Sequence, residues 1–530
     1  MAVCLFAETW KWGTFSYFFF VSCSQPSSYY LHFVTSSYLN EIYAQLPEPK
    51  SVWEYFLKVT QIPRGSNQEG ENWRHKQILA FLKKTAEDLG YETYVDKGDN
   101  LIVRKPAYPG CENKQTVCLQ CHMDMVCQAD DEIDIDFTKD PIIPRIDGKY
   151  LKATHTSLGA DDGIGIATCF AVLADKTIKH GPLEILVTRD EETGLYGASD
   201  LEPGILKATT LINVDNEDEN AICIGCAGGF NVELRLPTVR QIEEGFVSRE
   251  LVLNNFVGGH SGCDIHLGRA NPMHVLGRLL AALPDADSYR VLSLECGTAH
   301  NAIPRKCVAR LAVRAAAVDA VETQLRAAFA AFAHEYALIE PTASFALQAV
   351  EDARPPCDKQ STQRLVGFLN ACPFGPQRFS PVVEGLVETS MTCAIGTTED
   401  LDCLKFTVSV RSSSKSQIDF MYRKLECLCA MAGMAISQRI GEYPGWDPDP
   451  ESKVTKVMEK IYAELYGKQP WVYACHAGLE CGLIMQKYPG MDCTSVGPEV
   501  NFPHSPDERC LISSVPPFME VIRRTLEELE

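Results

Sequence analysis

Residues 116–124 read T-V-C-L-Q-C-H-M-D, a short apolar run that ends on a histidine and an aspartate. A run of this length and composition is typical of a buried strand. Further apolar runs at 183–189 and 210–214 also lead into acidic residues, and residues 163–175 have the pattern of a helix. Because buried strands alternate here with helices, we predict an α/β fold with a mostly parallel sheet and helices on both faces.

The middle of the chain has a different pattern, which predicts an α+β domain over residues 245–442. This domain interrupts the α/β domain, whose two parts are residues 46–244 and 443–530. Residues 1–45 precede them as an N-terminal extension. Its first 37 or so residues are partly apolar and aromatic, and three interpretations stay open: a signal peptide, an unusual extension or a mis-called start.

Bulk composition excludes several classes of partner. The 530 residues carry a formal net charge of −21, and such a surface repels phosphate backbones, so we expect no nucleic-acid partner. No apolar run reaches the roughly 18 to 20 residues needed to cross a bilayer, so we expect no membrane partner. The 22 cysteines are scattered along the chain, which favours a reduced, cytoplasmic setting over a disulfide scaffold.

Acidic residues and a histidine stand where the predicted strands end or the next helix begins. They are His122, Asp124, Asp161, Asp162, Glu191, Glu192 and Asp215. In open α/β sheets ligands bind outside the carboxyl ends of the strands. We therefore expect these side chains to lie close together.

Several carboxylates at one edge repel one another unless a cation offsets their charge. Histidine nitrogen with carboxylate oxygen is a zinc-type ligand set, which Mn²⁺ or Co²⁺ also fits. In the H-x-D spacing, Asp124 is placed to accept the second N–H of His122 and fix its tautomer. In the Glu191–Glu192 pair, one side chain can bind metal while the other acts as a general base towards water.

Motifs along the chain resemble the zinc aminopeptidase and carboxypeptidase superfamily, and within it the aminoacyl-histidine (Xaa-His) dipeptidase family. The resemblance covers about residue 45 to the C-terminus, with the motifs in the family order. They are L-Q-C-H-M-D-M-V, S-L-G-A-D-D-G-I-G-I-A, D-E-E-T-G, L-I-N-V-D, I-G-C-A-G-G, G-G-H-S-G, N-A-I-P-R, V-E-T-S, Y-P-G-W, H-A-G-L-E-C-G and P-H-S-P-D-E.

The resemblance implies a site for two divalent metal ions, with Zn²⁺ expected. The implied ligands are His122, Asp161, Glu192, Asp215 and His504, with Asp161 bridging the two ions. Glu191 matches the catalytic base, and Asp124 matches the residue that orients the first histidine. In this family the peptide bond after the bridging aspartate is often cis, here between Asp161 and Asp162.

The inserted domain is implied to be a lid that supplies substrate contacts and the surface of a homodimer. His260 matches a histidine that stabilises the tetrahedral oxyanion. Asn301 and Arg411 match residues that hold the substrate carboxylate, which suits the planar guanidinium of arginine. His476 and Glu480 match residues beside the substrate pocket.

These implications predict a cytoplasmic metallo-dipeptidase that hydrolyses small peptides, with Xaa-His dipeptides as the expected substrates. A water activated by the two ions would attack the peptide carbonyl, with Glu191 as general base. Two alternatives stay open: a deacylase or Cys-Gly-type dipeptidase that uses the same site, and a dimeric scaffold that has lost the chemistry.

Overall fold

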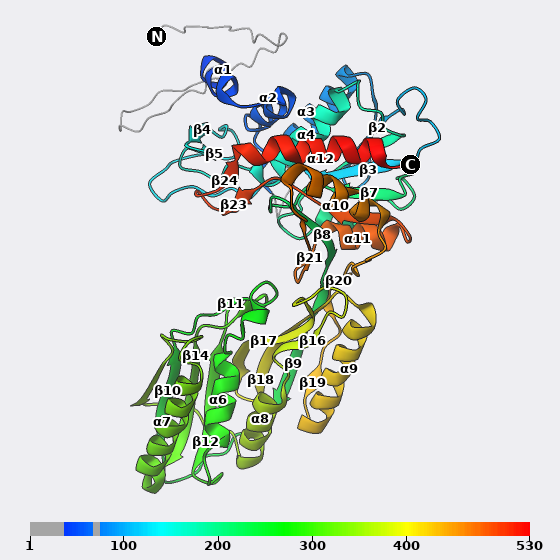
Figure 1. The fold of residues 1–530 in the computed structure, drawn as a ribbon. Coiled ribbons are helices and arrows are strands. Elements are labelled where there is room, and N and C mark those ends of the chain that lie inside the picture. The colour runs from blue at the N-terminus through cyan, green and yellow to red at the C-terminus, as the bar shows by residue number, and fades with distance from the viewer. Residues whose placement is uncertain (1–35, 67–74) are drawn as a thin grey trace. The chain divides into compact units, whose positions relative to one another are not determined.

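The computed structural model describes residues 36–66 and 75–530 (Figure 1). The chain forms two compact units. The first comprises the described residues up to Cys223 with Glu451–Val472 and Lys487–Glu530, and the second comprises Ile224–Pro450 and Tyr473–Gln486. The interpretations of the first 37 or so residues fall almost wholly outside the described residues.

An eight-stranded sheet forms the centre of the first unit. In spatial order its strands are β1 (Glu92–Val95), β2 (Leu101–Lys105), β6 (Leu183–Thr188), β3 (Val117–His122), β7 (Thr210–Asn213), β22 (Asp492–Ser495), β8 (Ala221–Cys226) and β21 (Trp471–Cys475). The sheet is mixed. The pairs within β6-β3-β7-β22 are parallel, whereas β1, β2 and β8 pair antiparallel. The parallel arrangement predicted from the apolar runs therefore holds for the four strands that lead to the site.

Helices cover this sheet. Those of the first unit are α1 (Ser36–Gln45), α2 (Lys50–Val59), α3 (His75–Asp88), α4 (Ala160–Ala174), α5 (Tyr196–Asp200), α10 (Lys453–Tyr466) and α12 (Val515–Glu528), with the short 3-10 helix η3 (Ile512–Ser514). Helix α4 packs on β3 and α2, α3 on β1 and β2, and α10 on β22 and α12. Helix α4 is apolar nearly all round, as expected of a helix buried on several sides.

Helix α1 lies within the predicted N-terminal extension, but it packs against the first unit. Leu39 and Ile42 are buried, and the Tyr38 hydroxyl donates to the carbonyl of Pro144 at 2.7 Å. Pro144 belongs to a second, four-stranded sheet. Its strands in order are β23 (Val500–Asn501), β24 (Arg509–Leu511), β5 (Tyr150–Ala153) and β4 (Pro144–Asp147). The compact part of the chain therefore begins before residue 46.

The second unit contains a larger sheet, in which every pair is antiparallel. Its main order is β15 (Ser344–Ala349), β10 (Phe246–Asn254), β14 (Cys307–Arg314), β12 (Tyr289–Cys296), β17 (Val387–Asp400), β18 (Cys403–Ser412), β9 (Gly228–Pro237) and β19 (Ala435–Ile436). Two further strands pair with it, β16 (Gly375–Phe379) with β17 and β20 (Ile440–Tyr443) with β9. Because β9 pairs along its length with β18, this unit begins at Ile224 and not at the predicted residue 245.

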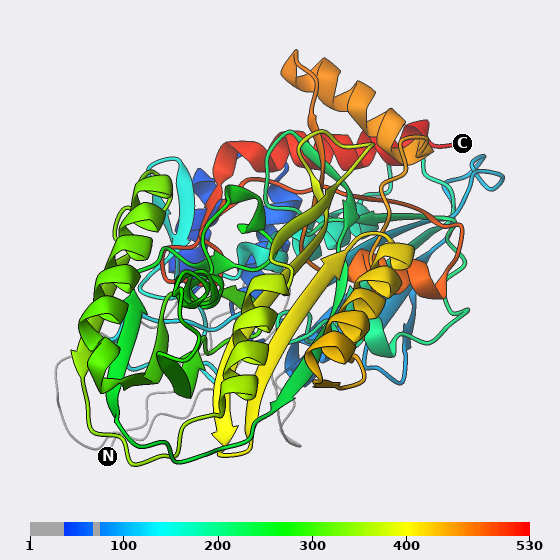
Figure 2. The same cartoon turned by 90° about the horizontal axis from the view of Figure 1, so that it is seen from below.

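A row of helices packs against this sheet (Figure 2). The helices are α6 (Pro272–Ala281), α7 (Val318–Glu335), α8 (Lys359–Ala371) and α9 (Lys415–Ala432), and each contacts the next in the order α7-α6-α8-α9. Aromatic rings fill the space between the layers, such as Phe368 against Phe406 with 4.7 Å between centroids. The smaller elements are β11 (Gly259–His260), β13 (Ala302–Ile303), α11 (Glu480–Lys487), η1 (Ile265–Leu267) and η2 (Ala315–Ala317).

In the first unit, one buried carboxylate holds the loop before α4. The two oxygens of Glu508 accept four backbone N–H bonds, from Leu158 at 2.7 Å, Gly159 at 2.9 Å, Ala160 at 2.7 Å and Asp161 at 3.3 Å. Glu508 is only 2% exposed, so these bonds form out of water. They also satisfy backbone donors at the start of the helix, where a negative charge is favourable.

A buried arginine, Arg64, also binds this loop. Arg64 donates to the carbonyl of Asp124 at 2.5 Å, to that of Met123 at 3.3 Å and, by a very short contact, to that of Gly159. Arg64 and Glu508 therefore connect three parts of the chain: the loop after β3, the loop before α4 and the loop after β23.

We predict that Glu508→Gln lowers the free energy of unfolding of the first unit by about 3 kcal/mol. The amide nitrogen of glutamine would face two backbone N–H donors that now share one oxygen. Urea denaturation measures the change. Glu464→Gln is the matched control, because Glu464 forms an exposed ion pair with Arg524 whose loss costs little. Equal stability of the two variants would contradict this role of Glu508.

Candidate functional site

The predicted strand-end residues lie together in the first unit. His122 is the last residue of β3, and Glu191 and Glu192 follow β6. Asp215 follows β7, and Asp161 lies in the first turn of α4. Because β6, β3 and β7 are parallel neighbours, their carboxyl ends meet at one edge of the sheet, as the sequence predicts.

Asp161 stands between two histidines. Its Oδ1 lies 2.9 Å from Nε2 of His122, and its Oδ2 lies 3.0 Å from Nε2 of His504. Each histidine also faces a second carboxylate, His122 that of Asp215 at 3.4 Å and His504 that of Glu192 at 2.8 Å. The five residues therefore form two groups of possible ligands that share one aspartate.

Asp124 organises the loops around His122. Its Oδ1 lies 3.3 Å from Nδ1 of His122, and its oxygens accept the backbone N–H groups of Glu191 at 3.0 Å and Glu192 at 3.3 Å. The Ser66 hydroxyl also donates to it at 2.7 Å. Asp124 is fully buried, so one carboxylate both faces the histidine ring and fixes the start of the Glu191–Glu192 loop.

The peptide bond between Asp161 and Asp162 is cis, as the resemblance implies. Asp162 belongs to neither ligand group and supports the backbone. Its Oδ2 accepts the backbone N–H of His122 at 3.2 Å, and its Oδ1 accepts that of Gly165 at 3.0 Å. The two neighbouring aspartates therefore have different roles. Asp161 faces both histidines, and Asp162 connects β3 to α4 through backbone hydrogen bonds.

Burial and mutual contacts shift the pKa values of the clustered carboxylates and of His504. Burial raises the pKa of Asp215 to about 6, although the charge of His122 and its hydrogen bond act to lower it. Burial also raises the pKa of Glu192. Hydrogen bonds to Asp161 and Glu192 raise the pKa of His504 to about 11. Burial alone would raise the pKa of Asp161. Its hydrogen bonds to the two histidines have the larger effect, and they hold this pKa well below the ordinary range.

A divalent cation fits this arrangement. Three carboxylates and two imidazole nitrogens point at one another, and within each ligand group the ligand atoms lie within 4.8 Å. Among the described residues, Oε1 of Glu192 is buried without a hydrogen-bond partner. Buried charges are normally paired or bound to metal, and nitrogen with oxygen ligands suits zinc and its neighbours in the transition series.

Sequence reasoning missed three residues near this site. Glu508 is the last letter of P-H-S-P-D-E, but only the structure shows which backbone groups it binds. Nothing in the sequence around Arg64 indicates its contacts with loops 59 to 95 positions away. Glu217 is a further carboxylate, whose pKa is raised to about 9 by burial and by the charges of Asp161 and Asp215. The L-I-N-V-D-N-E sequence contained that signal, two residues beyond Asp215.

Arg411 and two histidines of the predicted substrate-binding set lie near one another in the second unit. A Cβ added to Gly262 would lie 3.2 Å from both the His260 ring and the Arg411 side chain. Burial and the charge of Arg411 lower the pKa of His260, and together with His260 they lower that of His476 to about 3. Both imidazoles are therefore neutral at pH 7, next to a permanent cation.

Asn301 and Glu480, also predicted to contact substrate, occupy different environments in this unit. Asn301 is exposed, and its carbonyl accepts the backbone N–H of Ser261 at 2.8 Å. Glu480 is the buried first residue of α11. The Asn301 contact places it one residue from His260 in the β11–β13 region.

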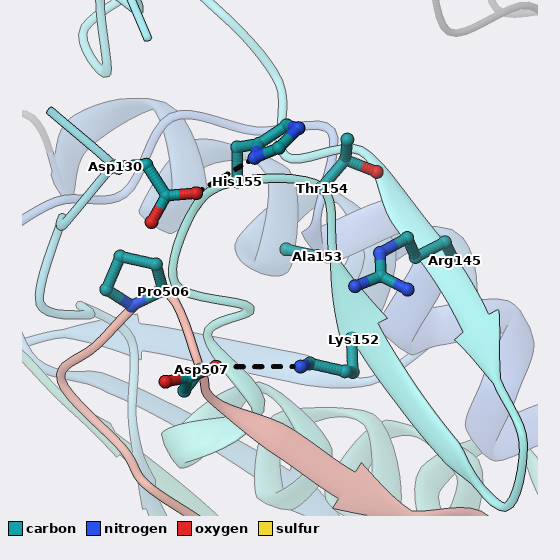
Figure 3. Close-up of a pocket in the computed structure, with 8 residues that line it drawn as sticks. All are labelled: Asp130, Arg145, Lys152, Ala153, Thr154, His155, Pro506 and Asp507. Carbon is teal, nitrogen blue, oxygen red and sulfur yellow. Dashed lines mark hydrogen bonds and ion pairs between the residues drawn. The ribbon is translucent and has the colours of Figure 1, made fainter. Parts of the chain in front are cut away.

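A separate cavity of about 300 Å³ lies in the first unit (Figure 3). Its charged groups are paired, with Lys152 Nζ 3.7 Å from Asp507 and His155 Nδ1 2.8 Å from Asp130. None of the predicted site residues lines it. This cavity therefore does not compete with the Asp161 groups as the candidate reaction centre.

No helix among the described residues has the length and apolar character needed to span a bilayer.

The chain is similar to known peptidases along most of its length. The M20 family model described as "Peptidase dimerisation domain" matches residues 252–339. The chain is 38% identical over 486 residues to the cytosol non-specific dipeptidase of Escherichia coli K12, covering 91% of this chain and 98% of that protein.

Two solved structures resemble the chain over most of its length. An aminoacylhistidine dipeptidase from Vibrio alginolyticus superposes with a TM-score of 0.85 at 38% identity, over 92% of this chain and 98% of that one. The aminopeptidase PepT of Bacillus cereus shares the fold, with a TM-score of 0.52 and 16% identity over 91% of this chain and 99% of that one. With a relative of this similarity along nearly its whole length, the chain belongs to the M20 family of metallopeptidases.

Proposed function

We propose that this chain is a dipeptidase that works with two divalent metal ions, with Zn²⁺ as the expected metal and Co²⁺ or Mn²⁺ as compatible ones. The observation that carries the proposal is the position of Asp161, whose two oxygens face two different histidines at 2.9 Å and 3.0 Å. A carboxylate shared in this way is the usual centre of a two-metal hydrolytic site.

The residues divide between the two ions as their contacts suggest. His122 and Asp215 would hold one ion, Glu192 and His504 would hold the other, and Asp161 would bind both. When bound, such ions polarise a carbonyl group and make a bound water more acidic. Asp124 would keep the His122 ring in place through its Nδ1 side.

Glu191 is proposed as the general base. One of its carboxylate oxygens lies within 4.8 Å of ligand atoms of His122 and Glu192, so it stands beside the ligand groups. The backbone N–H of Glu191 donates to Asp124, which fixes the start of its loop. In this role Glu191 takes a proton from the attacking water and returns it to the amine that leaves.

The second unit would contribute the contacts to substrate. His260 is proposed to stabilise the oxyanion, which a neutral imidazole can do by donating a hydrogen bond. Asn301 and Arg411 are proposed to hold the substrate carboxylate, with His476 and Glu480 beside the pocket. Glu480 offers a carboxylate for a free substrate amine.

We also propose that the chain forms a homodimer through the inserted domain, predicted as residues 245–442, and acts in the cytoplasm. The match to a peptidase dimerisation domain at residues 252–339 supports the dimer. The cytoplasmic setting is supported by the cysteines of residues 36–66 and 75–530, which form no disulfide.

Xaa-His dipeptides are the proposed substrates. One similar protein is named for aminoacylhistidine substrates and another as non-specific, so the two names differ in how narrow a preference they suggest. A deacylase or a Cys-Gly-type dipeptidase would use the same metal site, and a scaffold would use none. The filled ligand and base positions favour an active enzyme over a scaffold.

We predict that the purified protein cleaves Xaa-His dipeptides at least as fast as Cys-Gly and faster than N-acyl amino acids. A panel of these compounds, assayed by release of the free amino acids, measures the preference. Cleavage of N-acyl amino acids alone would favour the deacylase. No cleavage of any compound by protein that contains metal would favour the scaffold.

We predict two metal ions per chain in the active protein, measured by elemental mass spectrometry after dialysis. Asp161→Asn should weaken the binding of both ions because it removes the shared negative charge, whereas His504→Ala should weaken chiefly one. Removal of metal with a chelator should abolish activity, and added Zn²⁺ should restore it. Equal metal loss in the two variants would contradict the shared position of Asp161.

We predict that Glu191→Gln lowers kcat by about a thousandfold, within the range of lost general-base catalysis, while the metal content stays at the wild-type value. Glu202→Gln serves as control, because Glu202 pairs with Lys97 and Tyr94 away from the ligand groups. Near-normal turnover by Glu191→Gln would show that another group is the base.

A further inference from the structure

Four residues of the second unit form a row across neighbouring strands. Ser390 on β17 pairs with Arg411 on β18, Arg411 pairs with Gly229 on β9, and Gly229 pairs with Tyr443 on β20. Directly paired residues of antiparallel strands have their side chains on the same face of the sheet. Arg411 and Tyr443 therefore flank a position that has no side chain.

The glycine in this row makes room for a contact between its two neighbours. A Cβ on Gly229 would lie 2.9 Å from the Tyr443 hydroxyl, closer than real Cβ atoms approach. The ring of Tyr443 thus lies over Gly229, and its hydroxyl accepts a hydrogen bond from Nη1 of Arg411 at 2.7 Å. Gly478 also lies close to this ring, because a Cβ on it would lie 2.9 Å from a ring carbon of Tyr443. These close approaches explain why a glycine stands at position 229, the last residue of C-A-G-G, beside Tyr443, the first residue of Y-P-G-W.

Arg411 carries a positive charge without a carboxylate partner among the described residues. It is 8% exposed, it forms no ion pair with a described residue, and its Nε is buried without a hydrogen bond. The nearby His476 is neutral, and its Nε2 lies 2.7 Å from the Ser390 hydroxyl. The Tyr443 hydroxyl accepts a hydrogen bond but does not neutralise the charge. A buried, unpaired guanidinium is costly, which points to an anionic ligand as its missing partner.

We propose that Tyr443 is a positioning residue that holds the Arg411 guanidinium for a carboxylate, and thereby makes the enzyme select peptides with a free C-terminal carboxylate. The inference rests on the proposed function, in which Arg411 contacts substrate. Tyr443 uses one N–H of the guanidinium and restricts its rotation. The remaining N–H groups stay available as the planar fork that carboxylates bind.

The test compares a dipeptide with its C-terminal amide in the metal-loaded enzyme. Both compounds are assayed as substrates, and where turnover of the amide is too slow, as competitive inhibitors. Tyr443→Phe should weaken the wild-type preference for the acid about tenfold, through KM more than kcat, and leave the constants for the amide within about twofold. Tyr422→Phe is the matched control, since it removes a hydroxyl bonded to the Ser437 carbonyl at 2.9 Å in the same unit.

A double-mutant cycle with Arg411→Lys separates positioning from a general structural role. Lysine lacks the planar fork, so Tyr443→Phe should have no further effect on the acid-to-amide ratio in that background. An unchanged acid-to-amide ratio in Tyr443→Phe, including an equal loss of kcat/KM for both compounds, would overturn the inference. Wild-type enzyme that binds metal but cleaves no dipeptide would instead contradict the proposed function.

Discussion

The buried carboxylate of Glu508 holds together parts of the chain that are 347 to 350 positions apart. It binds the backbone of residues 158–161, and it lies four residues after His504. This arrangement places His504 against Asp161, although nothing local would bring them together. Arg64 extends the same framework to the loop after β3. The proposed metal ligands therefore depend on two buried charges that bind backbone and take no part in the proposed chemistry.

This framework lets the protein gather negative charges that repel one another. Asp161 is stabilised by its two histidines, whereas burial raises the pKa of Asp215 to about 6 and that of Glu217 to about 9. Cations would remove this repulsion, and the framework would hold the ligands in place before they bind. The same principle, with the sign reversed, applies to Arg411 in the second unit, where a buried cation lies beside neutral histidines and a tyrosine hydroxyl.

Much of the candidate metal site could be predicted from the sequence, because its residues follow local signals. The apolar runs that became β3, β6 and β7 end at His122, Glu191 and Asp215, and parallel pairing brings such ends together. His504 had no such signal and was found only through family resemblance. The backbone contacts of Arg64 and Glu508 could not be predicted from the sequence, since no local pattern shows which distant N–H or carbonyl group a side chain binds.

In the second unit, too, pairing between distant segments is not visible in the sequence. The sequence pattern does not predict strand β9 and therefore places the boundary at residue 245, although β9 pairs with β18 and belongs to this unit. The paired residues of β9 and β18 are more than 160 positions apart in the chain. The sequence therefore does not show the row of residues that brings Tyr443 over Gly229.

The most direct test of the account is a crystal structure of the zinc-loaded protein with anomalous scattering data at the zinc edge. We predict two anomalous peaks, one beside His122 and Asp215 and the other beside Glu192 and His504, with Asp161 bound to both. A single peak, or two peaks that do not share Asp161, would contradict the two-metal site.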